Sequence, residues 1–187
     1  MIRALIFDCF GVLYRDNLSM LYDVVPPEKH QELQDIIHAT DHGFLSRVDY
    51  YQQIAAITGK STEEIMRIDH RQHSRDEAMI ELLRHYKSVY KIGLLSNIDT
   101  DTINRLFPKT ERSELFDAFV ISGEVGMTKP TPELFELAAV KLAVDPEECV
   151  MIDDMPKNID GATMVGMKGI CFSSRSQLVG ELEKLLT

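Results

Sequence analysis

The 187-residue chain has no long hydrophobic run, few cysteines and fewer basic than acidic residues. No apolar stretch reaches the ~20 residues that a membrane-spanning helix needs, and the first apolar run is too short and wrongly flanked for a signal peptide. The formal charge of -10 repels phosphate backbones and anionic membranes. We therefore expect a cytoplasmic protein without a nucleic-acid or membrane partner. An anionic substrate must be attracted locally, by a bound cation or a placed lysine.

The chain has three cysteines, Cys9, Cys149 and Cys171, and no CxxC pair. An odd number without paired spacing fits neither a disulfide framework nor a zinc site. All three lie in or beside apolar runs, so we expect them to be buried as small hydrophobic residues. The length and composition are otherwise those of one compact globular domain, with room for a small inserted subdomain.

Five short apolar runs alternate with helical patterns along much of the chain. The runs are typical of buried strands that end in a polar residue or a turn. Strand and helix in regular alternation predict an α/β fold, a Rossmann-like parallel sheet covered by helices on both faces. The predicted strands are residues 2–8, 90–96, 118–122, 149–154 and 168–173.

About eighty residues separate the first two predicted strands, which is far more than one crossover helix needs. Three amphipathic patterns occupy this interval, at residues 28–38, 49–58 and 62–70. Ser61 and Glu64 have the spacing of a capping box at the start of the third. We therefore predict a small helical cap at residues 15–75, inserted after the first strand into a core made of residues 1–14 and 76–187.

Polar side chains stand where the predicted strands end. Asp8, Ser96 and Asp154 close three strands, and Lys129 follows another strand by a loop. The carboxyl ends of parallel strands share one edge of the sheet, where open sheets bind ligands. A single aspartate after a strand is usually a turn former or a helix cap. Four polar residues that converge on one edge instead predict a functional site.

The segments FDCFGVL, LLSN, GMTKP and MIDDMPKNIDGATMVGM resemble, in this order, the four motifs of the haloacid dehalogenase (HAD) superfamily. The predicted helical cap between the first two motifs also fits that superfamily. The short length, the small cap and the stretch GMTKPTPELF resemble a subgroup that includes bacterial sugar-1-phosphate phosphatases. The resemblance implies a hydrolase that uses Mg²⁺ and cleaves a small phosphate ester.

The resemblance assigns the phosphoryl chemistry to four side chains. Asp8 attacks phosphorus and becomes a transient aspartyl phosphate. Ser96 and the amide of Asn97 donate hydrogen bonds to phosphoryl oxygens, and Lys129 supplies a fixed positive charge. Such groups are needed because a hydrolase must neutralise the phosphoryl oxygens while it holds a nucleophile in line with the leaving oxygen.

The resemblance also implies a magnesium site. Asp8, Asp154 and the backbone carbonyl of Phe10 are the expected ligands, since hard oxygen donors suit this ion. Asp153 and Asn158 are expected not to bind the ion directly but to hold Lys129 or a metal-bound water.

Phe10 departs from the pattern of the superfamily. Most of its phosphatases have a second aspartate two positions after the nucleophile, which serves as general acid and then as general base. Phenylalanine cannot transfer a proton, and such help is worth about 10² to 10⁴ in rate. A sugar-1-phosphate phosphatase tolerates the change more easily, because an anomeric oxygen leaves more readily than an ordinary alkoxide. Tyr14, Asp16 and His42 are nearby candidates for proton transfer.

Two alternative interpretations stay open. A 2-haloacid dehalogenase attacks carbon and releases halide without a proton, so an aromatic residue at position 10 is natural there. Those enzymes work without a metal, however, and Asp153 and Asp154 beside Asp8 would repel one another without a cation. The second alternative is a catalytically weak or inactive binding or regulatory protein, against which the retention of four motif side chains counts.

The cap is expected to choose the substrate. Its stretch with His42, Phe44, Arg47 and Tyr51 is the predicted substrate-facing part. A cap of this size suits a small soluble metabolite rather than a macromolecule. The sequence indicates no oligomeric state.

Overall fold

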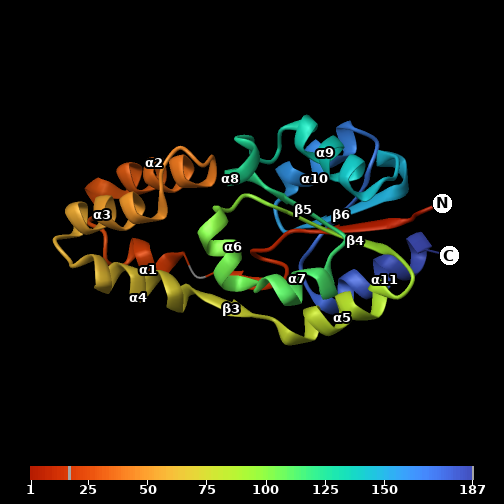
Figure 1. Ribbon diagram of the computed structural model, residues 1–187, viewed down its shortest axis with the longest axis horizontal. Coiled ribbons are helices and arrows are strands. Elements are labelled where there is room, and N and C mark those ends of the chain that lie inside the picture. Colours follow the sequence, from red (N-terminus) through yellow and green to blue (C-terminus); the bar gives the residue numbers. More distant parts are fainter. Residues whose placement is uncertain (17, 187) are drawn as a thin grey trace.

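The computed structural model describes residues 1–16 and 18–186, with the backbone alone at residues 16 and 72. A five-stranded parallel sheet runs through the core in the order β5-β4-β1-β6-β7 (Figure 1). Its strands are β1 (Ala4–Phe7), β4 (Lys91–Ser96), β5 (Ala118–Ile121), β6 (Cys149–Asp153) and β7 (Lys168–Cys171). The predicted α/β fold with a Rossmann-like sheet is therefore confirmed.

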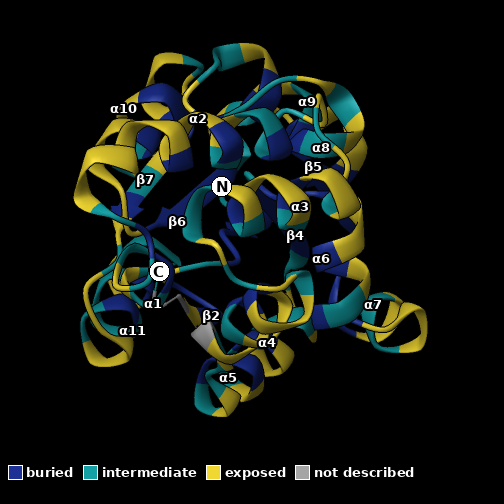
Figure 2. Cartoon of the chain, turned by 90° about the vertical axis from the view of Figure 1, so that its left-hand side faces the viewer, coloured by how far each residue is buried: buried dark blue, intermediate teal, exposed yellow. Residues whose placement is uncertain are grey.

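Helices cover both faces of this sheet. They are α5 (Glu77–Lys87), α6 (Thr100–Leu106), α7 (Lys109–Leu115), α8 (Ser122–Val125), α9 (Pro132–Leu142), α10 (Pro156–Met164), α11 (Arg175–Leu186) and the 3-10 turn η2 (Pro146–Glu148). Because side chains alternate along a strand, Leu5 and Phe7 of β1 pack with α5, α6 and α11, whereas Ala4 and Ile6 pack with α9 and α10. Figure 2 shows the strands buried inside and exposed residues on the outer faces of the helices.

A group of helices stands apart from the sheet, at the end where the strands terminate (Figure 1). An antiparallel ribbon of β2 (Tyr14–Asp16) and β3 (His73–Arg75) leads into and out of it. The group contains α1 (Ser19–Tyr22), the 3-10 turn η1 (Pro27–Lys29), α2 (His30–Asp41), α3 (Arg47–Thr58) and α4 (Thr62–Gln72). It buries an apolar cluster of its own, which includes Leu33, Ile54 and Ile65. We propose that these helices are the cap, with the predicted limits of residues 15–75.

The three helices predicted in this interval are present as α2, α3 and α4, with ends shifted by up to three residues. The capping box of Ser61 and Glu64 is confirmed at the start of α4. Among the described residues, no helix combines the length and apolar character needed to cross a bilayer.

The expectation for the cysteines holds for two of the three. Cys9 and Cys149 are buried, but Cys171 is exposed, so that prediction is wrong. The reason is that β7 is an edge strand, which presents Ile170 to the core and Cys171 to the opposite side.

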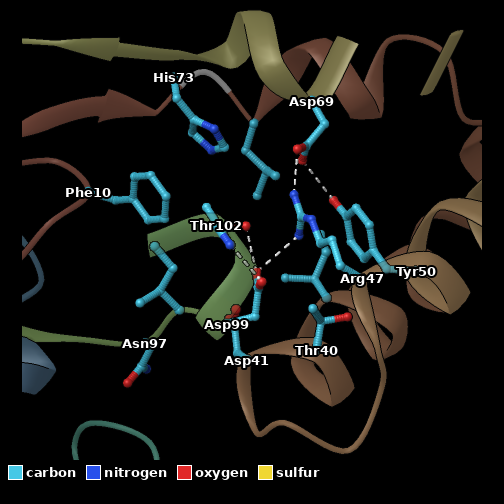
Figure 3. Close-up of a pocket in the computed structure, with 13 residues that line it drawn as sticks. Phe10, Thr40, Asp41, Arg47, Tyr50, Asp69, His73, Asn97, Asp99 and Thr102 are labelled. Carbon is cyan, nitrogen blue, oxygen red and sulfur yellow. Dashed lines mark hydrogen bonds and ion pairs between the residues drawn. The ribbon is translucent and has the colours of Figure 1, made fainter. Parts of the chain in front are cut away.

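Two ion pairs join the cap to the core, and Figure 3 shows the one between Arg47 and Asp99. Arg47 of α3 pairs with Asp69 of α4 and lies 3.3 Å from Asp99, the residue that caps α6. Asp69 is fully buried and also lies 3.7 Å from Arg105 of α6. The Arg47 guanidinium is centred 4.1 Å from the ring of Tyr50. A base of the cap thus meets an acid of the core, and an acid of the cap meets a base of the core.

The end of α2 forms a second junction with the core. Ser122 Oγ donates a hydrogen bond of 2.5 Å to the carbonyl of Asp41 and accepts one of 2.8 Å from the N–H of Ile98. Thr128 Oγ1 and His42 Nε2 lie 3.1 Å apart. Ile98 follows Asn97 in the sequence, and Thr128 precedes Lys129. The cap therefore docks on the loops that carry the candidate site.

We predict that Asp69→Asn lowers the free energy of unfolding by about 3 kcal/mol, because it leaves the Arg47 charge without its buried partner. Urea unfolding followed by circular dichroism measures the change. Glu32→Gln is the matched control, since Glu32 pairs with Lys29 on the surface, where both side chains are about half exposed. It should leave the unfolding midpoint close to that of the wild type. Equal effects of the two substitutions would contradict the role given to Asp69.

Candidate active site

Asp8 directly follows β1, the central strand of the sheet. Its N–H donates to the carbonyl of Ile152 at 2.9 Å, which continues the pairing with β6 and fixes the backbone at this point. The residue is 7% exposed. Its Oδ1 accepts hydrogen bonds from Cys9 N–H at 2.6 Å and from Ser96 Oγ at 2.8 Å, while Oδ2 lies 2.9 Å from Lys129 Nζ. The carboxylate is thus held at both oxygens.

Lys129 reaches Asp8 from the segment between α8 and α9. Its ammonium is buried and bridges Asp8 and Asp153, with the Asp153 Oδ2 atom at 2.5 Å. Asn97 positions the backbone of this lysine, because its Oδ1 accepts from Lys129 N–H at 2.7 Å and its Nδ2 donates to the Lys129 carbonyl at 3.2 Å. The amide of Asn97 therefore locks the loop after β4 to the segment that carries the lysine.

Asp153, the last residue of β6, is fully buried and has both oxygens occupied. Oδ1 accepts from the N–H of Met155 and from Nδ2 of Asn158, each at 2.9 Å. Oδ2 accepts from Lys129 and, at 3.0 Å, from the same Asn158 nitrogen. Asp153 therefore holds Lys129 in place and is itself held by the start of α10.

Asp154 is exposed and completes a cluster of carboxylates. One oxygen from each of Asp8, Asp153 and Asp154 lies within 4.8 Å of the others. The loop after β1 passes so close that a Cβ on Gly11 would fall 2.3 Å from Asp154 Oδ2, and the positive φ of 77° at Gly11 also requires glycine. Hard oxygen donors gathered at this spacing could hold a divalent cation.

The electrostatics of the site also call for a cation, because three carboxylates surround a single buried ammonium. Burial raises the pKa of Asp8, and the charge of Asp153 adds to this, although Lys129 opposes it. Burial and the charge of Asp153 likewise raise the pKa of Asp154. Burial opposes the ammonium form of Lys129, but the two carboxylates outweigh it and raise the pKa of the lysine. A divalent cation at Asp154 would relieve the repulsion.

Every side chain predicted for the site lies at this edge of the sheet. Asp8, Ser96, Lys129 and Asp153 are joined directly by hydrogen bonds or ion pairs, and Asn97, Asn158 and Asp154 surround them. Their roles toward a metal or a substrate, including the metal-binding carbonyl assigned to Phe10, stay predictions.

Three neighbouring cavities meet at Asn97. The phosphoryl cavity, of about 320 Å³, contains Asp8, Lys129 and Asp154. The inner cavity, of about 160 Å³, lies beneath the cap and contains Arg47 and Asp99 (Figure 3). The outer cleft, of about 720 Å³, lies between α2 and the core and is lined by residues that include Leu18, Tyr22, Ile37, His38, His42 and Lys157. The inner cavity and the outer cleft therefore both adjoin the cavity that contains Asp8.

The proton-transfer candidates are placed as follows. Tyr14 is buried, and its hydroxyl donates to the carbonyl of Leu106 at 2.7 Å, away from the cavities. His42 lines the outer cleft. The side chain of Asp16 lies outside the described residues. Of the two candidates whose side chains are described, His42 lines one of the three cavities and Tyr14 does not.

Several charged or polar lining residues were not singled out by the sequence analysis, among them Asp41, Asp69, His73, Asp99 and Lys157. Asp99 has a readable signal, since an aspartate before TDT is a helix N-cap pattern. Lys157 also has one, because it lies in the first turn of a helix that follows a motif strand. Of the substrate-facing cap residues that were predicted, His42 and Arg47 line a cavity, while Phe44 is 78% exposed.

We predict that Lys129→Met lowers the free energy of unfolding by about 3 kcal/mol or more at pH 8. The substitution leaves Asp8 and Asp153 buried without an ammonium, so the folded state binds protons that the unfolded state has already released, and stability falls as the pH rises. Urea unfolding at pH 5 to 8 in EDTA should therefore show recovery toward pH 5. Lys109→Met, at an exposed lysine, is the control. A loss of stability in Lys129→Met that does not change with pH would contradict the prediction.

Curated relatives resemble the chain along most of its length. Sesquiterpene phosphatase astK of Aspergillus oryzae is 26% identical over 197 residues, which cover 98% of this chain and 96% of astK. Drimenol cyclase drtB of Aspergillus calidoustus is 24% identical over 201 residues and matches 99% of this chain, but the chain spans 37% of that longer protein.

The fold also occurs in solved structures. The HAD family enzyme BT-2542 of Bacteroides thetaiotaomicron, crystallised with magnesium and inorganic phosphate, has a TM-score of 0.81 at 22% identity, over 95% of this chain and 99% of that chain. A likeness at this identity shows the fold alone. The sequence itself matches the family of haloacid dehalogenase-like hydrolases over residues 2–166, which is most of the chain. This chain therefore belongs to the haloacid dehalogenase-like hydrolase family.

Proposed function

We propose that this protein is a Mg²⁺-dependent phosphatase that hydrolyses a small phosphorylated metabolite through an aspartyl phosphate at Asp8. The observation that carries the proposal is the buried ammonium of Lys129, 2.9 Å from Asp8 and 2.5 Å from Asp153, beside the exposed carboxylate of Asp154. This arrangement provides a nucleophile, a fixed positive charge and a place for a metal. Phosphoryl transfer needs these three elements in particular, because its catalysis is mostly positioning and charge neutralisation.

Asp8, Asp154 and the backbone carbonyl of Phe10 would hold the magnesium ion. The ion would neutralise charge on the phosphoryl oxygens. Asn158 supports the assignment, since its Nδ2 donates to Asp153 while its Oδ1, buried and without a partner among the described residues, can accept a hydrogen bond from a water of the cation.

The remaining residues hold the phosphoryl group and the nucleophile. Lys129 orients Asp8 and offers its charge to the transferred group. Ser96 donates to Asp8 Oδ1 and can turn its hydroxyl to a phosphoryl oxygen when substrate is bound. Asn97 keeps Lys129 in place, and its contact with the phosphoryl group is part of the proposal.

The comparisons support this chemistry. One relative that matches almost the whole chain is a sesquiterpene phosphatase, and the fold neighbour BT-2542 was crystallised with magnesium and phosphate. The charge of -10 and the enclosed cavities favour a small substrate over a nucleic acid or a membrane, in keeping with the cytoplasmic location we propose. A sugar phosphate linked at its anomeric oxygen is one candidate, because that oxygen leaves readily.

Purified protein should release phosphate from at least one member of a panel of sugar and nucleotide phosphates in Mg²⁺, and EDTA should abolish the release. The panel includes glucose 1-phosphate and glucose 6-phosphate, and malachite green detects the product. Chloride release from 2-chloropropionate, unaffected by EDTA, would instead support the dehalogenase interpretation. Failure of every substrate in a folded protein would support the inactive binding protein.

Asp8→Asn should lower kcat by at least about 10⁴-fold, because the amide cannot attack phosphorus. Circular dichroism and the unfolding midpoint check that the variant stays folded. Asp101→Asn, an exposed aspartate on α6, is the matched control and should keep wild-type kcat. Turnover retained in Asp8→Asn would exclude Asp8 as the nucleophile.

A further inference from the structure

The inner cavity beneath the cap is lined by carboxylates. Asp41, Asp69 and Asp99 line it, and Arg47, the arginine in its lining, is already paired with two of these acids (Figure 3). Burial opposes the charge of Arg47, but Asp69, Tyr50 and Asp99 together outweigh it and raise the pKa of the guanidinium, so Arg47 stays charged. An anionic group entering this cavity would therefore meet excess negative charge.

The outer cleft carries more positive charge. Lys129 and Lys157 line it together with a single acid, Asp41, and the same two lysines line the phosphoryl cavity. A group that leaves the phosphorus atom toward this cleft passes between Asn97, Met155 and these lysines. An anionic leaving group is therefore attracted to the outer cleft and repelled from the inner cavity.

Lys157 has no structural task that explains its position. It is the second residue of α10, where the helix dipole disfavours a positive charge. Its side chain is exposed at the cleft and makes no hydrogen bond or ion pair with another described residue. A lysine that weakens its own helix and lines the same cavity as Asp8 is better explained by an anion that it binds.

The residues shared by the phosphoryl cavity and the inner cavity cannot donate a proton to a leaving group. Phe10 and Asn97 line both this cavity and the inner one, and neither can act as an acid. The ring of Phe10 stacks at 4.7 Å on His73, whose Nδ1 accepts from Arg105 at 3.2 Å. Burial lowers the pKa of His73 to about 4, so the imidazole is neutral and its basic nitrogen is occupied.

His42, in the outer cleft, has both ring nitrogens engaged within the protein. Nδ1 donates to the carbonyl of His38 at 2.8 Å, and Nε2 lies 3.1 Å from the hydroxyl of Thr128. Tyr22, His38 and Asp41 also line the outer cleft, but none of the three lines the phosphoryl cavity. Next to Asp8, the described surroundings therefore suit a leaving group that departs as a stable anion.

We propose that the substrate is a phosphoanhydride and that Lys157 binds its departing phosphate; this rests on the proposed function of Asp8. The Asp8 oxygen attacks one phosphorus atom, the bridging P–O bond breaks, and its electron pair stays on the departing phosphate, which leaves without taking a proton. Water then attacks the phosphorus on Asp8, the carboxylate is restored, and inorganic phosphate and one proton are released.

The test compares three substrates in Mg²⁺: inorganic pyrophosphate, glycerol 2-phosphate, whose leaving group is an uncharged alcohol, and p-nitrophenyl phosphate, which leaves easily without a second phosphate. We expect kcat/KM for pyrophosphate to exceed that for glycerol 2-phosphate by at least about 10²-fold, the lower range of general acid help. Similar values for these two substrates would overturn the proposal.

Variants of Lys157 test the subsite itself through the ratio of kcat/KM for pyrophosphate to kcat/KM for p-nitrophenyl phosphate. Lys157→Met should lower this ratio about tenfold, in the range of one charge-assisted hydrogen bond, and Lys157→Arg should restore most of it. Lys109→Met, which removes an exposed lysine from the start of α7, should leave the ratio unchanged. An equal loss on both substrates in Lys157→Met would overturn the assignment of Lys157 to the leaving group.

Failure of the two proposals is distinguishable. If none of the three phosphates is hydrolysed, the proposed phosphatase function is wrong. If p-nitrophenyl phosphate is hydrolysed but pyrophosphate is no better a substrate than glycerol 2-phosphate, the function stands and the phosphoanhydride is excluded.

Discussion

The buried ammonium of Lys129 is the interaction on which the rest of this structure depends. Taking a carboxylate or an ammonium out of water costs several kcal/mol for each ion, and here Asp8, Lys129 and Asp153 are all buried. Such a cluster persists because each oxygen has a partner: Ser96 and Cys9 N–H on Asp8, and Asn158 and Met155 N–H on Asp153. The parallel sheet makes this possible, since the adjacent strands β4, β1 and β6 bring their carboxyl ends together.

The same constraint explains where the cap docks. Lys129 lies on a segment that Asn97 fixes, and the residues next to these two in sequence, Ile98 and Thr128, meet the end of α2 through Ser122 and His42. The cap therefore rests on the loops that position the charges rather than on a distant part of the core. The crossed charges of Arg47 and Asp69 with α6 extend this contact and also form one wall of the inner cavity. Enclosure of a substrate and placement of the ammonium are thus structurally linked.

Much of the fold and of the site could be predicted from the sequence, because both depend on local patterns. Apolar runs ending in Asp8 and Ser96 mark the strand ends, and parallel pairing brings such ends together. The ribbon β2–β3 and the short helices α1, α7 and α8 could not be found this way, because three to seven residues are too few to show a period. The hydrogen bonds between Asn97 and Lys129 join residues 32 positions apart, and the ion pair of Arg47 with Asp69 joins residues 22 positions apart. Such contacts depend on tertiary structure alone.

The consequence of having Phe10 at this position can be interpreted only with the tertiary structure. In the sequence it is a residue that cannot transfer a proton, which leaves open whether the chain has lost its activity. In the fold its ring is packed on His73 and lines both the inner and the phosphoryl cavity. Acids predominate in the inner cavity, whereas Lys129 and Lys157 line the phosphoryl cavity and continue into the outer cleft. A site that had merely lost a catalytic group would have no reason to keep Asp8 buried against Lys129 at an energetic cost. The combination supports the proposals of a nucleophile at Asp8 and of a leaving group that needs no acid.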